Sequence, residues 1–206
     1  MANSRLCRQT LTVEHWSDAA LDALAEGGVD AVAVEPIARR LGVTKGSFYW
    51  HFPNRQALLD AALQRWERQQ TEEVIARAEQ EQDAMARISR LFRSADASRR
   101  AGRIYLSLAL AGNDPVVGAV VRRVTQRRIR FITDCYRALG LDPDTARRRA
   151  MVAYSVYLGT LQLRRDAPEL IPAGPDFQDY MDNICCLLIP GFASSNAVGT
   201  GRNGAG

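Results

Sequence analysis

Residues 34–52, VEPIARRLGVTKGSFYWHF, constrain the fold of this chain more than any other segment. Two short stretches with helical spacing, 34–41 and 45–51, flank Gly42, which tolerates the positive φ that a tight turn demands. Ala38 is small, so the second helix can approach the first closely. The segment therefore predicts a helix-turn-helix, in which two short helices cross at a wide angle.

Apolar and polar side chains divide between two sides of the second short helix. Val43 and Phe48 would fix its crossing, and Phe52 shares the inward face of Phe48 because it lies four residues further on. Thr44 would cap the N-terminus, and Lys45, the only lysine of the chain, lies in the first turn, which enters the major groove first. All but one of the remaining side chains are types that contact phosphates or base edges. They are Thr44, Lys45, Ser47, Tyr49, Trp50 (the exception) and His51.

Helical spacing continues through the rest of the chain, with Gly, Pro and Asn between the helices. The predicted helices are 12–26, 34–41, 45–51, 55–81, 83–94, 99–111, 116–139, 143–165 and 176–189. We therefore predict an all-α protein with a three-helix helix-turn-helix domain over 1–54 and a larger helical domain over 55–191. Residues 168–175 are expected to form a loop, and the small, polar residues 192–206 a disordered tail.

The basic charge of the chain lies outside the helix-turn-helix. The formal net charge is +4, but residues 1–63 hold six Lys and Arg against seven Asp and Glu. Residues 87–165 hold 17 Arg against five Asp. A positive net charge permits nucleic-acid binding but does not establish it. The prediction of DNA binding therefore rests on the residue pattern near Lys45. We expect a solvated face, rather than an anionic ligand, to account for five arginines that surround most of one helix. These are Arg122, Arg123, Arg127, Arg128 and Arg130.

Other functional classes find little support in the sequence. No apolar run reaches the ~18 residues that a membrane span needs, and Arg5 and Arg8 precede no apolar signal segment, so we expect a cytoplasmic protein. There is no Gly-rich phosphate loop, no nucleophile–base arrangement and no metal spacing, which predicts no enzyme, cofactor or metal site. The four cysteines are expected to be free thiols acting as small buried side chains: Cys7, Cys135, Cys185 and Cys186.

Residues 12–63 closely resemble the TetR family of regulators. The usual family pattern is I-A-x-x-x-G-V-S-x-G-x-[LF]-Y-x-[HY]-F, followed by Lys or Arg at the start of the next helix. Here it is IARRLGVTKGSFYWHF, followed by Arg55. The resemblance implies a homodimer on double-stranded DNA at a palindromic operator, and a repressor that a small hydrophobic ligand releases. A dimeric DNA-binding regulator without a small-molecule ligand remains the alternative.

The resemblance also implies which side chains contact DNA. Thr44, Lys45, Ser47, Tyr49 and His51 fall where the family touches DNA, and Arg55 falls where it often contacts a phosphate. Three side chains have a structural alternative. Tyr49 would instead pack on the first helix, Trp50 would contact either the DNA backbone or the core, and His51 would cap the helix.

The chain departs from the family at the start of the second helix. The family usually places Thr or Ser there, followed by a basic or polar residue, whereas this chain has Ala33, Val34 and Glu35. Glu35 would repel a phosphate that it faced. Four arginines are available to compensate, although solvated surface explains each of them equally well: Arg5, Arg8, Arg39 and Arg40.

Residues 64–191 match the family only in architecture, which implies dimerisation and a ligand pocket. The helices at 143–165 and 176–189 would form a four-helix bundle with their copies, helped by Gly159 and Thr160 and by a wide apolar stripe on the last helix. Mixed aromatic and apolar residues suit a flat hydrophobic ligand with a few polar groups, although each is also expected as ordinary core. The pocket candidates are Trp66, Phe92, Tyr105, Phe131, Cys135, Tyr154, Tyr157 and Gln162.

Overall fold

The computed structural model of the chain describes residues 11–94, 99–172 and 174–192, and these contain helices and turns without any strand. The α-helices are α1 (Val13–Gly27), α2 (Val34–Arg40), α3 (Lys45–Tyr49), α4 (Arg55–Glu67), α5 (Glu73–Glu79), α6 (Ala84–Ser94), α7 (Arg99–Leu110), α8 (Pro115–Ala138), α9 (Pro143–Asp166) and α10 (Pro175–Leu188). The shorter segments are the 3-10 turns η1 (Val29–Ala31) and η3 (Pro168–Leu170) and the π-helical segment η2 (Arg68–Glu72). The all-α prediction is confirmed, and η3 lies in the predicted loop.

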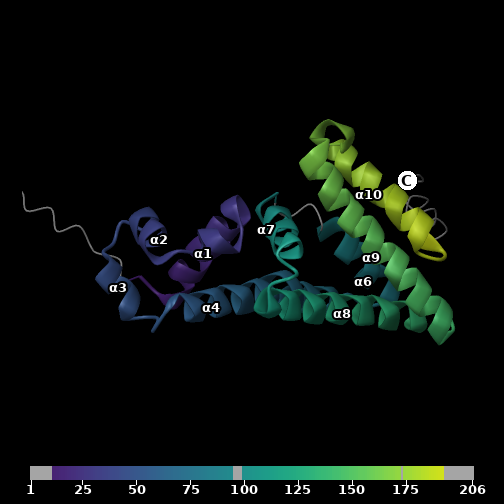
Figure 1. The fold of residues 1–206 in the computed structure, drawn as a ribbon. Coiled ribbons are helices and arrows are strands. Elements are labelled where there is room, and N and C mark those ends of the chain that lie inside the picture. The colour runs from purple at the N-terminus through teal and green to yellow at the C-terminus, as the bar shows by residue number, and fades with distance from the viewer. Residues whose placement is uncertain (1–10, 95–98, 173, 193–206) are drawn as a thin grey trace, which may run out of the picture.

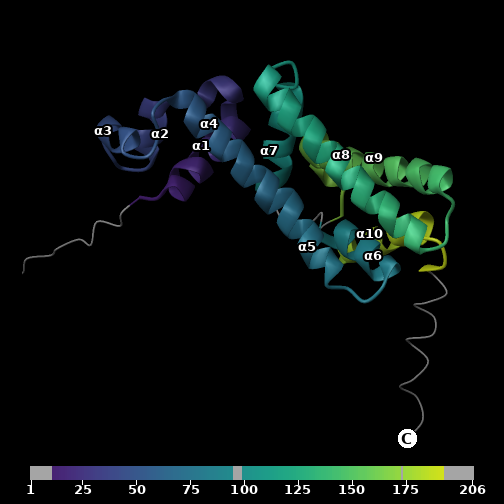
Figure 2. The same ribbon diagram turned by 90° about the horizontal axis from the view of Figure 1, so that it is seen from below.

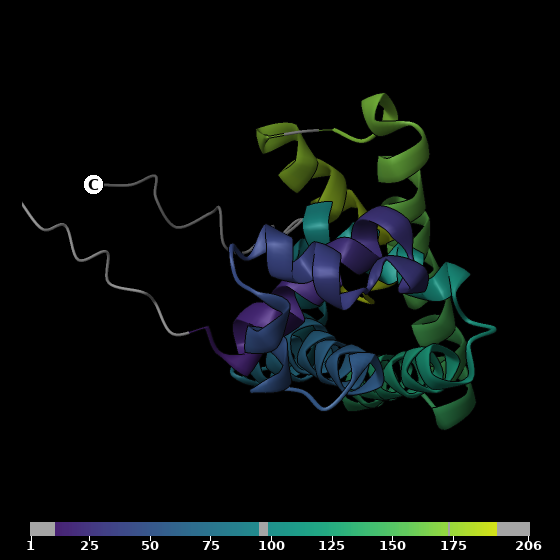
Figure 3. The same ribbon diagram turned by 60° about the vertical axis from the view of Figure 1, so that its left-hand side comes forward.

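The helices are arranged along the molecule, with α1, α2 and α3 at one end and α9 and α10 at the other (Figure 1). Figure 3, in which the first end comes forward, shows α1 and α2 above the rod formed by α4. Figure 2 shows α4 running on into α5, as the single helix predicted over 55–81 would. A π-helical turn widens this rod at Arg68–Glu72.

Aromatic packing holds the helix-turn-helix together. Phe48 is fully buried, and its ring stacks on Phe52 with centroids 5.5 Å apart and meets the edge of Trp16 at 5.4 Å. Gly42 has φ of 68°, which L-amino acids with a side chain rarely adopt. The turn closes where the Val43 amide donates to the Ala38 carbonyl at 3.0 Å. The expected roles of these residues are thus observed.

Two apolar cores lie along the molecule. The first joins α1 to α4 with parts of α7 and α8, since Ile104, Leu108 and Val117 are buried in the same cluster as Trp16 and Phe48. The second joins α5, α6, α9 and α10 with the C-terminal half of α8. Buried packing therefore continues across residue 54, where we placed the domain boundary.

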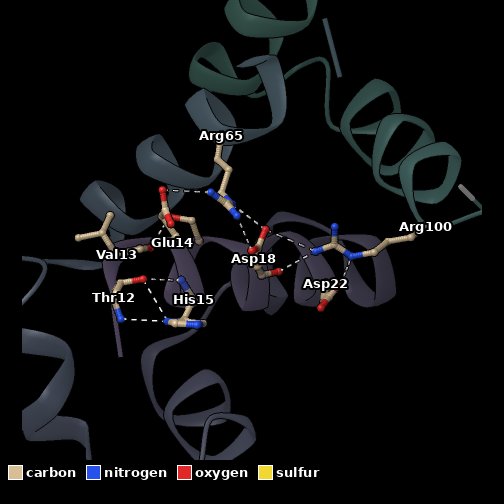
Figure 4. Close-up of polar contacts among 9 residues, drawn as sticks. Thr12, Val13, Glu14, His15, Asp18, Asp22, Arg65 and Arg100 are labelled. Carbon is tan, nitrogen blue, oxygen red and sulfur yellow. Dashed lines mark hydrogen bonds and ion pairs between the residues drawn. The ribbon is translucent and has the colours of Figure 1, made fainter. Parts of the chain in front are cut away.

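Ion pairs add to the first core where α4 and α7 meet α1 (Figure 4). Arg65 of α4 donates to both carboxylate oxygens of Asp18 at 2.7 Å. From α7, Arg100 bonds Asp22 at 2.5 Å and the Asp18 carbonyl at 3.1 Å. The helices after residue 54 thus hold α1 from two directions.

Some expectations need correction at individual residues. Phe192, assigned to the tail, is buried among the second core because its aromatic ring packs there, while residues 193–206 lie outside the described part. Cys135 and Cys185 are buried as expected, but Cys186 is exposed because the next position of the helix turns outward. Cys7 lies outside the described residues. Burial raises the pKa of the Cys135 and Cys185 thiols to about 11.

Candidate DNA interface and ligand cavity

Helix α3 presents two large aromatic side chains to solvent. Phe48 is fully buried and anchors the helix, whereas Tyr49 is 57% exposed and Trp50 is 88% exposed. The Tyr49 ring lies edge-on to Phe48, with centroids 5.2 Å apart. Of the two alternatives for Trp50, burial in the core is excluded. Large aromatic rings in water mark an interaction surface, and here they adjoin Lys45 and the half-buried Ser47.

Lys45 makes an ion pair with Glu35 from the first turn of α2. Its Nζ lies 2.8 Å from Glu35 Oε1, and both side chains are more than half exposed. The hydrogen bond and charge of Lys45 lower the pKa of Glu35, and those of Glu35 raise the pKa of Lys45. Glu35 is therefore the counter-ion of Lys45, and an anion that bound Lys45 would compete with it.

Three further DNA-contact candidates surround α3. Thr44 occupies the N-cap position with extended backbone, but its side chain makes no capping bond there. His51 is half-buried, with its ring 6.4 Å from that of Phe52. Arg55 donates through Nε to the Val32 carbonyl and through Nη2 to the Val29 carbonyl, both at 2.6 Å. Arg55 thus ties the first turn of α4 to the segment before α2.

A cavity of about 100 Å³ lies between η2, α6, α8 and α9. Four of the eight pocket candidates line it: Phe92, Phe131, Tyr154 and Tyr157. Apolar side chains of α5 and α6, including Ile75 and Ile88, complete most of its wall. The cavity wall thus combines aromatic and apolar side chains.

The other four candidates do not line this cavity. Trp66 and Tyr105 pack on each other with centroids 6.4 Å apart, in the first core. Cys135 is buried in the second core one helical turn beyond Phe131. Gln162 is exposed, and its amide donates to Asp166 at 2.5 Å. Gln162 therefore points away from the site.

Arg128 is a cavity residue that sequence analysis assigned to the solvated face of its helix. Its guanidinium lies 5.7 Å from the ring centroid of Trp66, 5.9 Å from that of Tyr105 and 6.0 Å from that of Tyr157. A signal was present, because Val124, Arg128 and Phe131 follow one another at i, i+4 and i+7 on the buried face of α8. Burial raises the pKa of Tyr157 and of Tyr105, so both phenols are neutral at neutral pH.

Metal-binding and membrane-spanning features are lacking in the described part of the chain. Within residues 11–94, 99–172 and 174–192, no three His, Cys, Asp or Glu side chains come together as metal ligands would. None of the helices described in those ranges combines the length and apolarity of a bilayer span.

A helix-turn-helix that buries Phe48 and Phe52 and turns the outer side of its second helix to solvent is the architecture of a DNA-binding transcription regulator. Residues 17–62 match the family model described as bacterial regulatory proteins, tetR family. The tetracycline repressor protein class G of Vibrio anguillarum is 32% identical over 165 residues, which are 78% of this chain and 73% of that protein. The chain belongs to the TetR family.

Two other relatives show how similarity is distributed. The class A tetracycline repressor from transposon 1721 of Escherichia coli is 56% identical over 43 residues, 21% of this chain and 20% of that protein. This match spans about a fifth of the relative's length. The regulator FadR of Bacillus subtilis, solved with stearoyl-CoA, superposes with a TM-score of 0.65 over 86% of this chain and 98% of that chain at 17% identity. The family model thus matches residues 17–62, while the fold is shared over 86% of the chain.

Proposed function

We propose that the protein is a homodimeric repressor in the cytoplasm, released from a palindromic operator when a small molecule binds its cavity. The observation that carries the proposal is the pairing of a buried Phe48 with exposed Tyr49 and Trp50 on α3. Phe48 holds the helix firmly while its outer side stays available to a major groove. Thr44, Lys45, Ser47 and His51 would supply the polar contacts from the same region.

An exposed apolar face on α9 supports a homodimer. Met151 is 52% exposed and Val152 54%, and they line a shallow surface depression with Ser155. Gly159 is exposed further along, with open space where a Cβ would be. A second copy crossing here would bury this face at close approach.

The sequence-based account of the dimer face requires two changes. Thr160 points into its own protomer, since it is 4% exposed and donates to the Val156 carbonyl at 3.0 Å. On α10, Phe177 and Met181 are likewise buried within the protomer, and Leu187, 79% exposed, is the outward apolar residue. The stripe on α10 therefore belongs to the second core of its own protomer, and the proposed contact rests on the outer faces of α9 and α10.

The rod made by α4 and α5 supports the coupling between cavity and DNA. Arg55 fixes its first turn to Val29 and Val32, and η2, further along, contributes Gln70 and Thr71 to the cavity wall. A helix is stiff along its axis, so displacement at η2 would tilt α3. Half-sites in successive major grooves are about 34 Å apart, so a small tilt in each protomer would misplace one set of contacts.

The experiment is to select a duplex from a random DNA library and measure binding by fluorescence anisotropy. Affinity should fall steeply with salt, because phosphate neutralisation releases counterions. A ligand found for the cavity should then bind the free protein more tightly than the operator complex, by about 2.7 kcal/mol for a hundredfold loss of DNA affinity. A flat salt response contradicts DNA binding, and equal ligand affinities contradict release.

A further inference from the structure

A guanidinium is built into the wall of the otherwise largely apolar cavity. Arg128 reaches it from α8 and is fixed in place by η2. Its Nε donates to Thr71 Oγ1 at 3.0 Å, and its Nη2 donates to the Gln70 carbonyl at 2.8 Å. The rings of Trp66, Tyr105 and Tyr157 flank the guanidinium, so aromatic contacts as well as hydrogen bonds hold it in position.

Nη1, the remaining nitrogen of the Arg128 guanidinium, is buried and has no hydrogen-bond partner among the residues that the structure describes. Among the residues that the structure describes, no carboxylate lies within 4.0 Å of Arg128, whereas seven other arginines with described side chains have such a carboxylate from a different helix or turn. An unpaired buried charge is costly unless an anion compensates it. The cavity thus holds a positive charge with an unused donor.

The neighbouring groups leave that charge uncompensated. Thr71 and Gln70 contribute neutral acceptors, and the phenols of Tyr105 and Tyr157 are held neutral by their raised pKa values. Neutral acceptors orient a guanidinium without cancelling its charge. A carboxylate would do both, because its oxygens make charge-assisted hydrogen bonds with guanidinium N–H groups.

The size of the cavity limits the rest of the ligand. At about 100 Å³ it is smaller than the roughly 150 Å³ space that accommodates benzene. Ile75, Ile88 and Phe131 form apolar wall, which favours a hydrocarbon body. A short alkyl chain fits directly, and one ring fits with small side-chain adjustments.

We propose that the cavity binds a small organic monocarboxylate, with the carboxylate against the guanidinium of Arg128 and an apolar body no larger than one ring. This inference rests on the proposed function, since it names the ligand class of the same site. It replaces the expectation of a solvated arginine face at this position. The same guanidinium donates to Thr71 and to the Gln70 carbonyl of η2. A carboxylate bound to it would therefore lie directly against η2.

The experiment compares matched carboxylates and amides by titration calorimetry on the full chain. The pairs are butyrate with butyramide and benzoate with benzamide, which differ little in shape but differ in charge. Each carboxylate should bind about five- to tenfold more tightly than its amide, the range expected for a charge-assisted hydrogen bond in place of a neutral one. Inorganic phosphate, which has no apolar body, should bind more weakly than butyrate.

Variants identify the residue responsible. Arg128→Gln should remove the preference for the carboxylate, while Arg128→Lys, which keeps the charge, should retain part of it. Arg130→Gln, on the exposed side of the same helix, is the matched control and should change nothing. The wild-type comparison stands by itself if Arg128→Gln does not fold. Amides that bind as tightly as carboxylates, phosphate that binds as well as butyrate, or carboxylates that fail to bind at millimolar concentration would each overturn the proposal.

Operator binding separates this inference from the proposed function. If a carboxylate binds selectively yet leaves operator affinity unchanged, the ligand class stands and ligand release is contradicted. If a neutral molecule binds and releases the operator while carboxylates do not, release stands and the anionic ligand is contradicted.

Discussion

Arg65 in α4 forms a bidentate ion pair with Asp18 in α1, with Nε 2.7 Å from Oδ1 and Nη2 2.7 Å from Oδ2. The Arg65 side chain is only 15% exposed, and the hydrogen bond with Asp18 raises its pKa. Bidentate geometry fixes both the distance between the two side chains and their relative orientation. The contact therefore sets how the first helix sits on the rod that leads to the cavity.

Asp18→Asn should destabilise the fold, because it leaves the largely buried Arg65 without its anionic partner. We expect a loss of about 1–2 kcal/mol in the free energy of unfolding, below the value for a fully buried pair since Asp18 is itself 36% exposed. Urea denaturation followed by circular dichroism measures this. Asp134→Asn, at an exposed position of α8, is the control and should stay within about 0.5 kcal/mol of the wild type. Equal stability of the two variants would show that the Arg65–Asp18 ion pair does not contribute to the free energy of unfolding.

Glu35→Gln should strengthen operator binding. The substitution removes the carboxylate that pairs with Lys45, so the lysine is available to a phosphate without competition. The pair is exposed, so we expect a gain of about two- to fivefold in affinity, measured by anisotropy at low salt. In a Lys45→Met background the same substitution should have a smaller effect. A gain that persists undiminished there would show that Glu35 acts independently of Lys45.

Trp50→Ala and Phe48→Ala should separate DNA contact from folding. Trp50 is 88% exposed, so its loss should leave thermal stability unchanged while weakening operator binding. Phe48 is fully buried, and its truncation should cost about 3–5 kcal/mol of stability. Thermal melts and anisotropy on the same preparations test both. Full operator affinity in Trp50→Ala would mean that this ring does not meet DNA.

Val152→Asp should convert the dimer to a monomer. The side chain is 54% exposed in the protomer, so the aspartate is tolerated there but would be desolvated inside a dimer interface. Sedimentation equilibrium gives the mass of the species in solution. Leu110→Asp, at a 79% exposed apolar residue of α7, is the matched control and should leave the mass unchanged. A Val152→Asp protein that remains dimeric would place the interface elsewhere.

Local signals made the helices predictable. Gly42, Pro115 and Pro143 mark helix limits through their own backbone preferences, and the structure begins or ends helices close to each of them. The helix-turn-helix was equally accessible, because its determinants lie within residues 34–52.

Contacts between distant residues were not predictable in this way. The π-helical turn at Arg68–Glu72 lies where Arg128 bonds Thr71, 57 residues away in sequence. Spacing likewise could not separate Phe131, which lines the cavity, from Cys135, one turn further and outside it. The Glu35–Lys45 pair was missed because it depends on how α2 crosses α3.

The first core has a consequence for building hybrid regulators. A swap at residue 54 would cut between Trp16 and Phe48 on one side and Ile104, Leu108 and Val117 on the other, although all five belong to one cluster. The transplanted helices α1 to α3 would then face a foreign surface on α7 and α8. Asp18 would also lose its partners Arg65 and Arg100. A chimera should therefore take α4 from the same parent as α1 to α3, and its α7 surface should be redesigned to pack against them. This would preserve the packed contact through which the two halves of the chimera must communicate.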